Sequence, residues 1–258
     1  MNKSMVFNHY SHMLDTLLDN SLFFQYFFQS PFCLDEDISH PCYDLDWYIH
    51  FGATRVCLED RAYDYVVKID MFNSDACEKE MNVYAAAVQE GMTQYFVEPI
   101  YLGIYTRTIN FYDSKAIELN MPDFYDYDEE WFEDKFADNE DSFGELQPIT
   151  IALPLYAYKR IAPFNFYPTY NLLAEEEQSE LEVAARKVKS PLRERNLAVA
   201  IEFVKEYGEE EYKRFTEFLK DWEVNDLHVN NVCLLENHLV ISDFAGYEST
   251  CYSYDSSY

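Results

Sequence analysis

The chain has 258 residues, enough for one two-lobed domain or two small domains around a substantial core. Hydrophobic residues make up 48% of it and aromatic residues 18%, which excludes a disordered chain. The formal net charge of -29 repels nucleic-acid phosphates and lipid head groups, so we expect neither direct nucleic-acid binding nor membrane binding. The same charge attracts basic proteins, and it imitates a nucleic acid towards a protein that binds one.

The six cysteines are scattered without a CxxC pair, which favours reduced thiols in a cytoplasm over disulfides or a zinc site. No run reaches the length of a membrane span. Residues 5–30 have helical spacing and carry Asp15 and Asp19 inside their apolar stretch, so they predict an amphipathic helix and not a signal peptide. We expect a cytoplasmic protein, in the host cytoplasm if the chain is viral, with an N-terminal helical extension at 1–46.

The remaining pattern predicts a strand-rich half followed by a helical half. A lobe at 47–161 would hold an antiparallel sheet and one helix, and a reduced lobe at 162–258 would hold helices, a loop and a hairpin. The elements expected within them are strands over 47–72, a helix over 75–90, a strand pair over 97–112, a strand over 149–161, helices over 171–189, 191–207 and 209–222, and a final hairpin turning at Glu236-Asn237.

An acidic segment at 113–147 interrupts the strand-rich half. It holds 13 acidic residues against two lysines, a net charge of -11, interleaved with Phe, Tyr and Trp. A purely solvated loop would not need those aromatic residues, so the segment either docks on the body of the protein or on a partner. The alternative is a surface excursion without a partner.

The most specific motif lies in the final segment, VNDLHVNNVCLLENHLVISDFAGYE. Asp226 and Asn231 are five positions apart, and Asp243 ends an apolar strand. This resembles the catalytic loop and metal-binding hairpin of the protein-kinase-like superfamily, and the DLHxxN wording is similar to aminoglycoside phosphotransferases and short bacteriophage serine/threonine kinases. The resemblance implies Asp226 as the catalytic base, and Asn231 and Asp243 as ligands of Mg²⁺ on ATP. The alternative is a loop whose Asp and Asn form local turn hydrogen bonds.

The strand YVVKI places Val66 and Lys68 on one face and Tyr65, Val67 and Ile69 on the other. A lysine beside a small aliphatic residue resembles the kinase V-A-I-K strand, in which the ammonium meets the ATP phosphates and the aliphatic residue covers the base. The alternative is that Lys68 is an ordinary strand lysine whose side chain is exposed to solvent.

The helix at 75–90 has a predicted buried stripe of Cys77, Met81, Tyr84 and Val88. The stripe selects Glu80 over Glu78 as the inward acid, and the resemblance makes Glu80 the partner of Lys68. The alternative is a glutamate at the edge of the stripe that reaches water.

Gly52 stands in FGATRV, where kinases carry a glycine-rich loop over the phosphates. The three-glycine pattern is absent, so this indication is weak by itself. Val224 and Asn225 replace the kinase His-Arg, Ala245 replaces the last glycine of D-F-G, and the sequence ends soon after Asp243. The resemblance therefore implies an α+β, two-lobed protein-kinase-like fold with a truncated C-terminal lobe.

Three functions fit these features. The first is an ATP- and Mg²⁺-dependent phosphotransferase of the phage Ser/Thr kinase type, acting on basic host proteins. The second is a kinase-fold binding protein whose acidic surface mimics nucleic acid and sequesters a host nucleic-acid-binding or defence protein. The third is a small-molecule phosphotransferase like the aminoglycoside enzymes, although the long helical extension that binds such substrates is not evident after Asp243.

Overall fold

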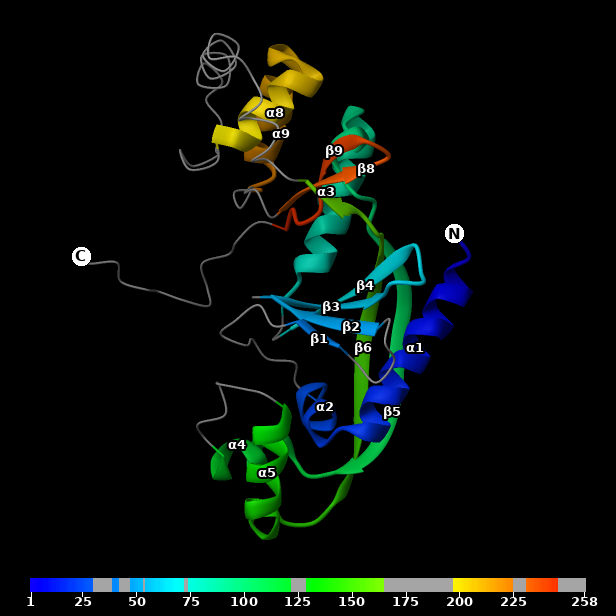
Figure 1. Ribbon diagram of the computed structural model, residues 1–258, viewed down its shortest axis with the longest axis vertical. Coiled ribbons are helices and arrows are strands. Elements are labelled where there is room, and N and C mark those ends of the chain that lie inside the picture. The colour runs from blue at the N-terminus through cyan, green and yellow to red at the C-terminus, as the bar shows by residue number, and fades with distance from the viewer. Residues whose placement is uncertain are drawn as a thin grey trace, which may run out of the picture. The chain divides into compact units, whose positions relative to one another are not determined.

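The computed structural model describes residues 1–29, 39–41, 47–52, 54–71, 74–121, 129–164, 197–224 and 231–245. They form a mixed α+β structure in which every pairing between named strands is antiparallel (Figure 1). The elements in chain order are α1 (Lys3–Asn20), α2 (Leu22–Phe27), β1 (Ser39–Pro41), β2 (Trp47–Phe51), β3 (Arg55–Asp60), β4 (Tyr65–Asp70), α3 (Ala76–Glu90), η1 (Thr93–Tyr95), β5 (Ile100–Phe111), α4 (Ser114–Asn120), α5 (Glu129–Asn139), η2 (Glu140–Ser142), β6 (Gln147–Lys159), β7 (Ala162–Pro163), α8 (Leu197–Tyr207), α9 (Glu209–Asp221), β8 (Val232–Leu235) and β9 (His238–Ile241).

The chain divides into two compact units. Unit 1 comprises 1–77 and 99–160, and unit 2 comprises 78–98 and 161–258. The sequence placed the helix at 75–90 in the N-terminal lobe, whereas nearly all of α3 belongs to unit 2. The reason is its buried face, because Val83 and Ala87 share a core with Phe203 and Phe215 of α8 and α9.

Unit 1 is built on a six-stranded sheet with the order β1-β2-β3-β4-β6-β5. The predicted strand pair over 97–112 is wrong, because β5 is a single strand and its partner β6 follows the acidic segment. Gly103, at φ 135, sits at a register shift after Tyr101. The bulge interrupts the side-chain alternation there, which explains why the sequence pattern suggests two shorter strands.

Helix α1 lies along β5 and packs its apolar face into the core of unit 1 (Figure 1). The continuous helix predicted over 5–30 is broken at Ser21, whose side chain accepts the backbone N–H of Phe24 and caps α2. In the parts of the chain that the structure describes, no helix is both long and apolar enough to cross a bilayer.

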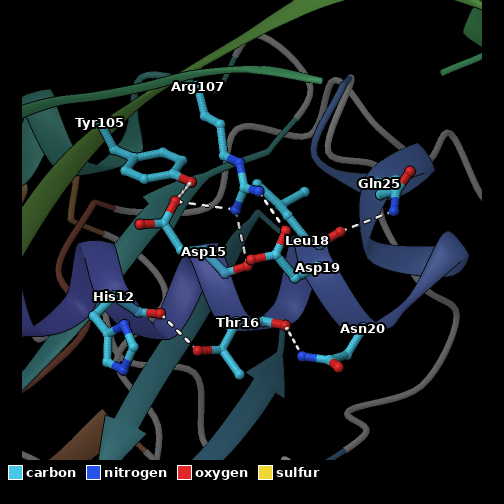
Figure 2. Close-up of polar contacts among 9 residues, drawn as sticks. All are labelled: His12, Asp15, Thr16, Leu18, Asp19, Asn20, Gln25, Tyr105 and Arg107. Atoms are coloured by element: carbon cyan, nitrogen blue, oxygen red, sulfur yellow. Dashed lines mark hydrogen bonds and ion pairs between the residues drawn. The ribbon is translucent and has the colours of Figure 1, made fainter. Parts of the chain in front are cut away.

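Arg107 of β5 fastens α1 to the sheet, as Figure 2 shows. Its guanidinium donates to the backbone oxygen of Asp15 at 2.9 Å and to the carboxylate of Asp15 at 3.1 Å. A second nitrogen pairs with Asp19. Tyr105, two residues earlier on the same strand face, donates its hydroxyl to Asp15 at 2.7 Å. These contacts explain why α1 carries two acidic residues, Asp15 and Asp19, within its apolar pattern, because both pair with Arg107 of β5.

The acidic segment docks on unit 1 through its aromatic side chains. Phe132 and Phe136 of α5 are buried in the same core as α1 and the sheet. The Phe136 ring stacks on Phe111 of β5 with ring centroids 5.4 Å apart. Of the alternatives that the sequence left open, docking on the body of the protein is confirmed for these residues.

Unit 2 pairs α8 and α9 beside a small sheet of order β7-β8-β9 (Figure 1). The Phe203 ring stacks on Phe215 with centroids 5.2 Å apart, and the Tyr207 hydroxyl donates to the backbone oxygen of Leu239 at 2.7 Å. The predicted break between the last two helices is confirmed at Gly208, whose φ is 87. The helix predicted at 171–189 lies outside the described residues.

We expect Phe136→Ala to lower the free energy of unfolding by about 3–5 kcal/mol, because it leaves a cavity between α5 and β5. Leu119→Ala is the matched control on α4, where the side chain is 80% exposed, and should change that free energy by less than about 0.5 kcal/mol. Urea unfolding followed by circular dichroism measures both. Equal, small effects of the two substitutions would contradict the docking of the acidic segment.

Candidate functional site

Lys68 lies on the face of the six-stranded sheet that points away from the core of unit 1. Its neighbours Val67 and Ile69 are fully buried, and the strand period of two directs Lys68 and Val66 the other way. The predicted alternation is therefore confirmed. The ammonium nitrogen of Lys68 lies 4.4 Å from the ring centroid of Tyr158 on β6, which is a cation–π contact.

Two further side chains stand directly opposite Lys68 in the sheet, Cys57 on β3 and Tyr156 on β6. Burial raises the pKa of the Cys57 thiol to about 11, and the positive charge of Lys68 offsets only part of that rise. The thiol is therefore neutral near pH 7. The charges of Arg55 and Glu59, each two positions from Cys57 on β3, also act on this thiol, so the surroundings of Lys68 include charged as well as aromatic and apolar groups. A cation beside an aromatic ring suits a ligand that combines a ring with phosphate groups.

Gly52 lies in the turn between β2 and β3, where the kinase resemblance predicts a loop that covers the phosphates of ATP. Its backbone N–H donates to the oxygen of Arg55 at 2.9 Å and closes that turn. This amide is therefore occupied within the turn. A Cβ at Gly52 would lie 3.4 Å from the Arg55 oxygen, at the near limit of an ordinary van der Waals contact.

Glu80 of α3 is fully buried, whereas Glu78 is exposed, as the helical period predicts. The predicted stripe itself is partly wrong. Val88 is 57% exposed, and Val83 and Ala87 are buried instead. The sequence pattern identifies the buried face of a helix from its large apolar side chains. Several positions of this helix are alanines, and an alanine is found on exposed as well as on buried faces, so the pattern does not show which face is buried.

The carboxylate of Glu80 binds the segment that follows β9. Its Oε1 accepts the backbone N–H of Phe244 at 2.9 Å, and Phe244 is itself fully buried. The Phe244 ring packs on Phe96 with centroids 4.9 Å apart. Glu80 therefore holds in place the residue that directly follows Asp243. The predicted pairing of Glu80 with Lys68 joins residues of different units and stays a prediction.

The β8–β9 hairpin brings Asn231 and Asp243 to the same end. Val232 pairs with Ile241, and Ser242 donates its backbone N–H at 2.9 Å and its hydroxyl at 3.2 Å to the backbone oxygen of Asn231. The predicted turn at Glu236-Asn237 is confirmed, with φ values of 54 and 69.

The side chains at this end provide an amide oxygen and a carboxylate, the oxygen donors that Mg²⁺ prefers. Among the described residues, no three His, Cys, Asp or Glu side chains converge on a common point. Asn231 and Asp243 could therefore hold Mg²⁺ only together with oxygens from elsewhere, such as those of phosphates, waters or Asp226. Asp226, the predicted base, lies outside the described residues, as does His228.

Two contacting residues were missed by the sequence reasoning, Phe244 and Asp70. Tyr158 was expected near the adenine, as part of a hinge at 158–162 that the kinase resemblance implies, but its contact with Lys68 was not predicted. Phe244 reaches Glu80 through tertiary packing, for which a single sequence carries no local signal. Asp70 ends β4, six positions before α3 begins, so no local rule points to it either. Its carboxylate accepts the backbone N–H of Cys77, in the first turn of α3, at 3.1 Å.

Sequence comparisons do not add a relative to this picture. No protein-family model matches the chain, and no curated protein matches it either. A functional assignment therefore depends on the residues and the geometry described above.

We expect Glu80→Ala to raise the hydrogen-exchange rate of the Phe244 amide roughly 10- to 100-fold, because a buried donor loses an acceptor at a cost of about 1–3 kcal/mol. Glu80→Gln keeps an oxygen acceptor and should have a smaller effect. Glu78→Ala is the control on the exposed side of α3. Amide exchange followed by NMR or mass spectrometry measures all three, and equal rates in Glu80→Ala and Glu78→Ala would contradict the contact.

Proposed function

We propose that the chain is an ATP- and Mg²⁺-dependent phosphotransferase of the protein-kinase-like type, acting on Ser or Thr hydroxyls of proteins. The observation that carries the proposal is the way unit 2 holds the residues next to Asp243. The residue before it, Ser242, is hydrogen-bonded to the backbone oxygen of Asn231, and the buried Glu80 carboxylate binds the backbone N–H of the residue after it. Such preorganised oxygen ligands are what phosphoryl transfer requires, since its catalysis is mainly positioning and charge stabilisation.

The order of the elements supports a two-lobed kinase-like fold. A hairpin of β2 and β3 with Gly52 at its turn comes first, then the strand of Lys68 and the helix of Glu80. The long strands β5 and β6, with α4 and α5 between them, follow, and then β7, α8, α9 and the β8–β9 hairpin. This is the order in which the kinase-like superfamily carries its glycine-rich loop, lysine strand, glutamate helix and metal-binding hairpin.

Each residue has a role in the proposed reaction. The Lys68 ammonium pairs with ATP phosphates, and Val66 on the same face covers the base. Asn231 and Asp243 would hold Mg²⁺, which would supply positive charge to offset that of the phosphates. The Asp226 carboxylate orients the substrate hydroxyl and accepts its proton. The hydroxyl oxygen bonds to the γ-phosphorus, the bond to the β–γ bridging oxygen breaks, and ADP leaves.

We expect Mg²⁺ with ATP to raise the melting temperature of the protein, and Asp243→Asn to remove most of that rise, because binding stabilises only the folded state. Lys68→Met should weaken the rise without removing the metal ligands. Lys159→Met, at an exposed position of β6, is the matched control and should keep it. Differential scanning fluorimetry measures the shifts.

Turnover needs a separate measurement. Label from γ-labelled ATP should appear on a basic protein substrate with the wild-type chain and should fall at least about 100-fold with Asp226→Ala, since general-base catalysis contributes that much. Nucleotide binding without label transfer, or equal transfer by Asp226→Ala, would rule out the catalytic part of the proposal.

A second function is favoured by the way the acidic segment is held. Because Phe132 and Phe136 anchor α5 in the core, its exposed acids, among them Asp134 and Asp138, are presented on a fixed surface. Such a surface is suited to a basic, nucleic-acid-binding protein that it captures by charge. In this case the acidic surface, and not Lys68, would carry the function.

The two functions separate in a binding experiment. Neutralising Asp134 and Asp138 to Asn should lower retention of a purified DNA-binding protein several-fold, since each contact depends on charge. Lys68→Met should leave retention unchanged, and excess double-stranded DNA should displace the partner. If Lys68→Met lowers retention and the neutralised variant does not, capture by the acidic surface is excluded.

A further inference from the structure

Arg55 is a second cation on the face of the six-stranded sheet that carries Lys68. It begins β3 and alternates there with Val56 and Leu58, which are fully buried in the core of unit 1. The strand period of two therefore directs Arg55 to the face of Lys68. Only 6% of Arg55 is exposed. A charge leaves water at a cost in free energy, so an arginine buried on an outward face indicates a position held for an interaction.

The strand register places Arg55 and Lys68 within reach of one ligand. Cys57 stands opposite Lys68, and Arg55 is two positions from Cys57 on β3. Such diagonal neighbours of an antiparallel pair lie roughly 7–8 Å apart. Burial raises the pKa of the Cys57 thiol, whereas the charges of Lys68 and Arg55 both lower it, so both cations act at this point of the sheet. Two long cationic side chains at this spacing can contact neighbouring groups of one polyphosphate.

The acidic side chains beside the two cations are engaged within the protein. Glu59 pairs with His50 at 2.9 Å and with Arg160 at 4.0 Å. The carboxylate of Asp70, which stands opposite Arg55 in the register, accepts a backbone N–H of α3 at 3.1 Å. Asp70 can also hold one side of Arg55 and leave the other side for a ligand, because a guanidinium carries more N–H donors than one carboxylate accepts.

The turn before Arg55 explains why a side chain is needed here. The Gly52 amide, which the kinase resemblance assigns to the phosphates, is bonded to the backbone oxygen of Arg55 at 2.9 Å. The backbone oxygen of Thr54 accepts the N–H of Met71 at 3.0 Å and fastens the turn to the end of β4. With a single glycine and its amide in use, cover for phosphates has to come from a side chain, and Arg55 follows the turn directly.

We propose that Arg55 and Lys68 form a two-cation clamp on the phosphate groups of a nucleoside triphosphate, with Arg55 in the place of a glycine-rich loop. The inference rests on the proposed nucleotide site and adds a residue to it. Lys68 supplies a point charge, and Arg55 supplies a planar fork that can pair with two oxygens of a phosphate. ATP binding therefore depends on Arg55, whereas binding of adenosine, which has no phosphate, does not.

Isothermal titration calorimetry of the full chain with ATP and with adenosine tests the clamp. Arg55→Met should raise the dissociation constant of ATP roughly 10- to 100-fold, because charge-assisted hydrogen bonds are lost, and should leave that of adenosine unchanged. Arg55→Lys keeps the charge without the fork and should have a smaller effect. Arg214→Met removes the same charge from α9 in unit 2 and is the matched control, with unchanged ATP binding. Circular dichroism of each variant establishes that the fold is retained.

The Cys57 thiol offers a second measurement that needs no change at Arg55. Cys57 is partly exposed, whereas Cys77 and Cys233 are buried and serve as internal references. Inorganic tripolyphosphate held between the two cations should slow alkylation of Cys57 by iodoacetamide several-fold, as peptide mass spectrometry measures. Sodium chloride at the same ionic strength should not. Lys68→Met should retain part of this protection, because Arg55 remains.

The outcomes separate this inference from the proposed phosphotransferase. ATP that binds wild type and Arg55→Met equally would overturn the clamp and leave catalysis through Lys68 standing. Arg55-dependent ATP binding without transfer of label would support the clamp and exclude turnover. If Arg55→Met does not fold, the alkylation decides, since a Cys57 that tripolyphosphate fails to protect, or that loses all protection in Lys68→Met, would also overturn the clamp.

Discussion

A hydrogen bond inside unit 2, from the backbone N–H of Phe244 to the carboxylate of Glu80, sets the position of the candidate metal ligands. Both residues are fully buried, so neither group can exchange its partner for water without opening the core. The bond ties α3 to the end of the β8–β9 hairpin, where Asn231 and Asp243 stand. A carboxylate is unfavourable in an apolar core unless it is hydrogen-bonded. The buried Glu80 carboxylate has such a bond and anchors the chain next to the proposed metal ligand Asp243.

Unit 1 must bury an apolar core although the chain carries a large excess of acidic side chains. Its aromatic residues turn inward, as Phe136 does from the acidic segment, and leave the charges outside. Arg107 places a cation where α1 brings Asp15 and Asp19 to the sheet.

Local patterns in the sequence predict the features that depend on local periodicity. The alternation around Lys68, the inward position of Glu80 and the turn at Glu236-Asn237 follow from the periods of strands, helices and turns. The partner of β5 does not, because it lies beyond the acidic segment and is chosen by register over a long separation. Nor does the Glu80–Phe244 bond, which joins residues 164 positions apart.

The central claim is that Asn231 and Asp243 hold the metal of a metal–nucleotide complex. Mn²⁺ in place of Mg²⁺ tests it directly, because paramagnetic broadening of NMR signals depends on distance from the ion. With ATP and Mn²⁺ present, we expect the Asn231 side-chain amide and the backbone amides of Ser242 and Phe244 to broaden first, and this effect to vanish in Asp243→Asn. Saturating nucleotide that leaves these signals sharp would contradict the account.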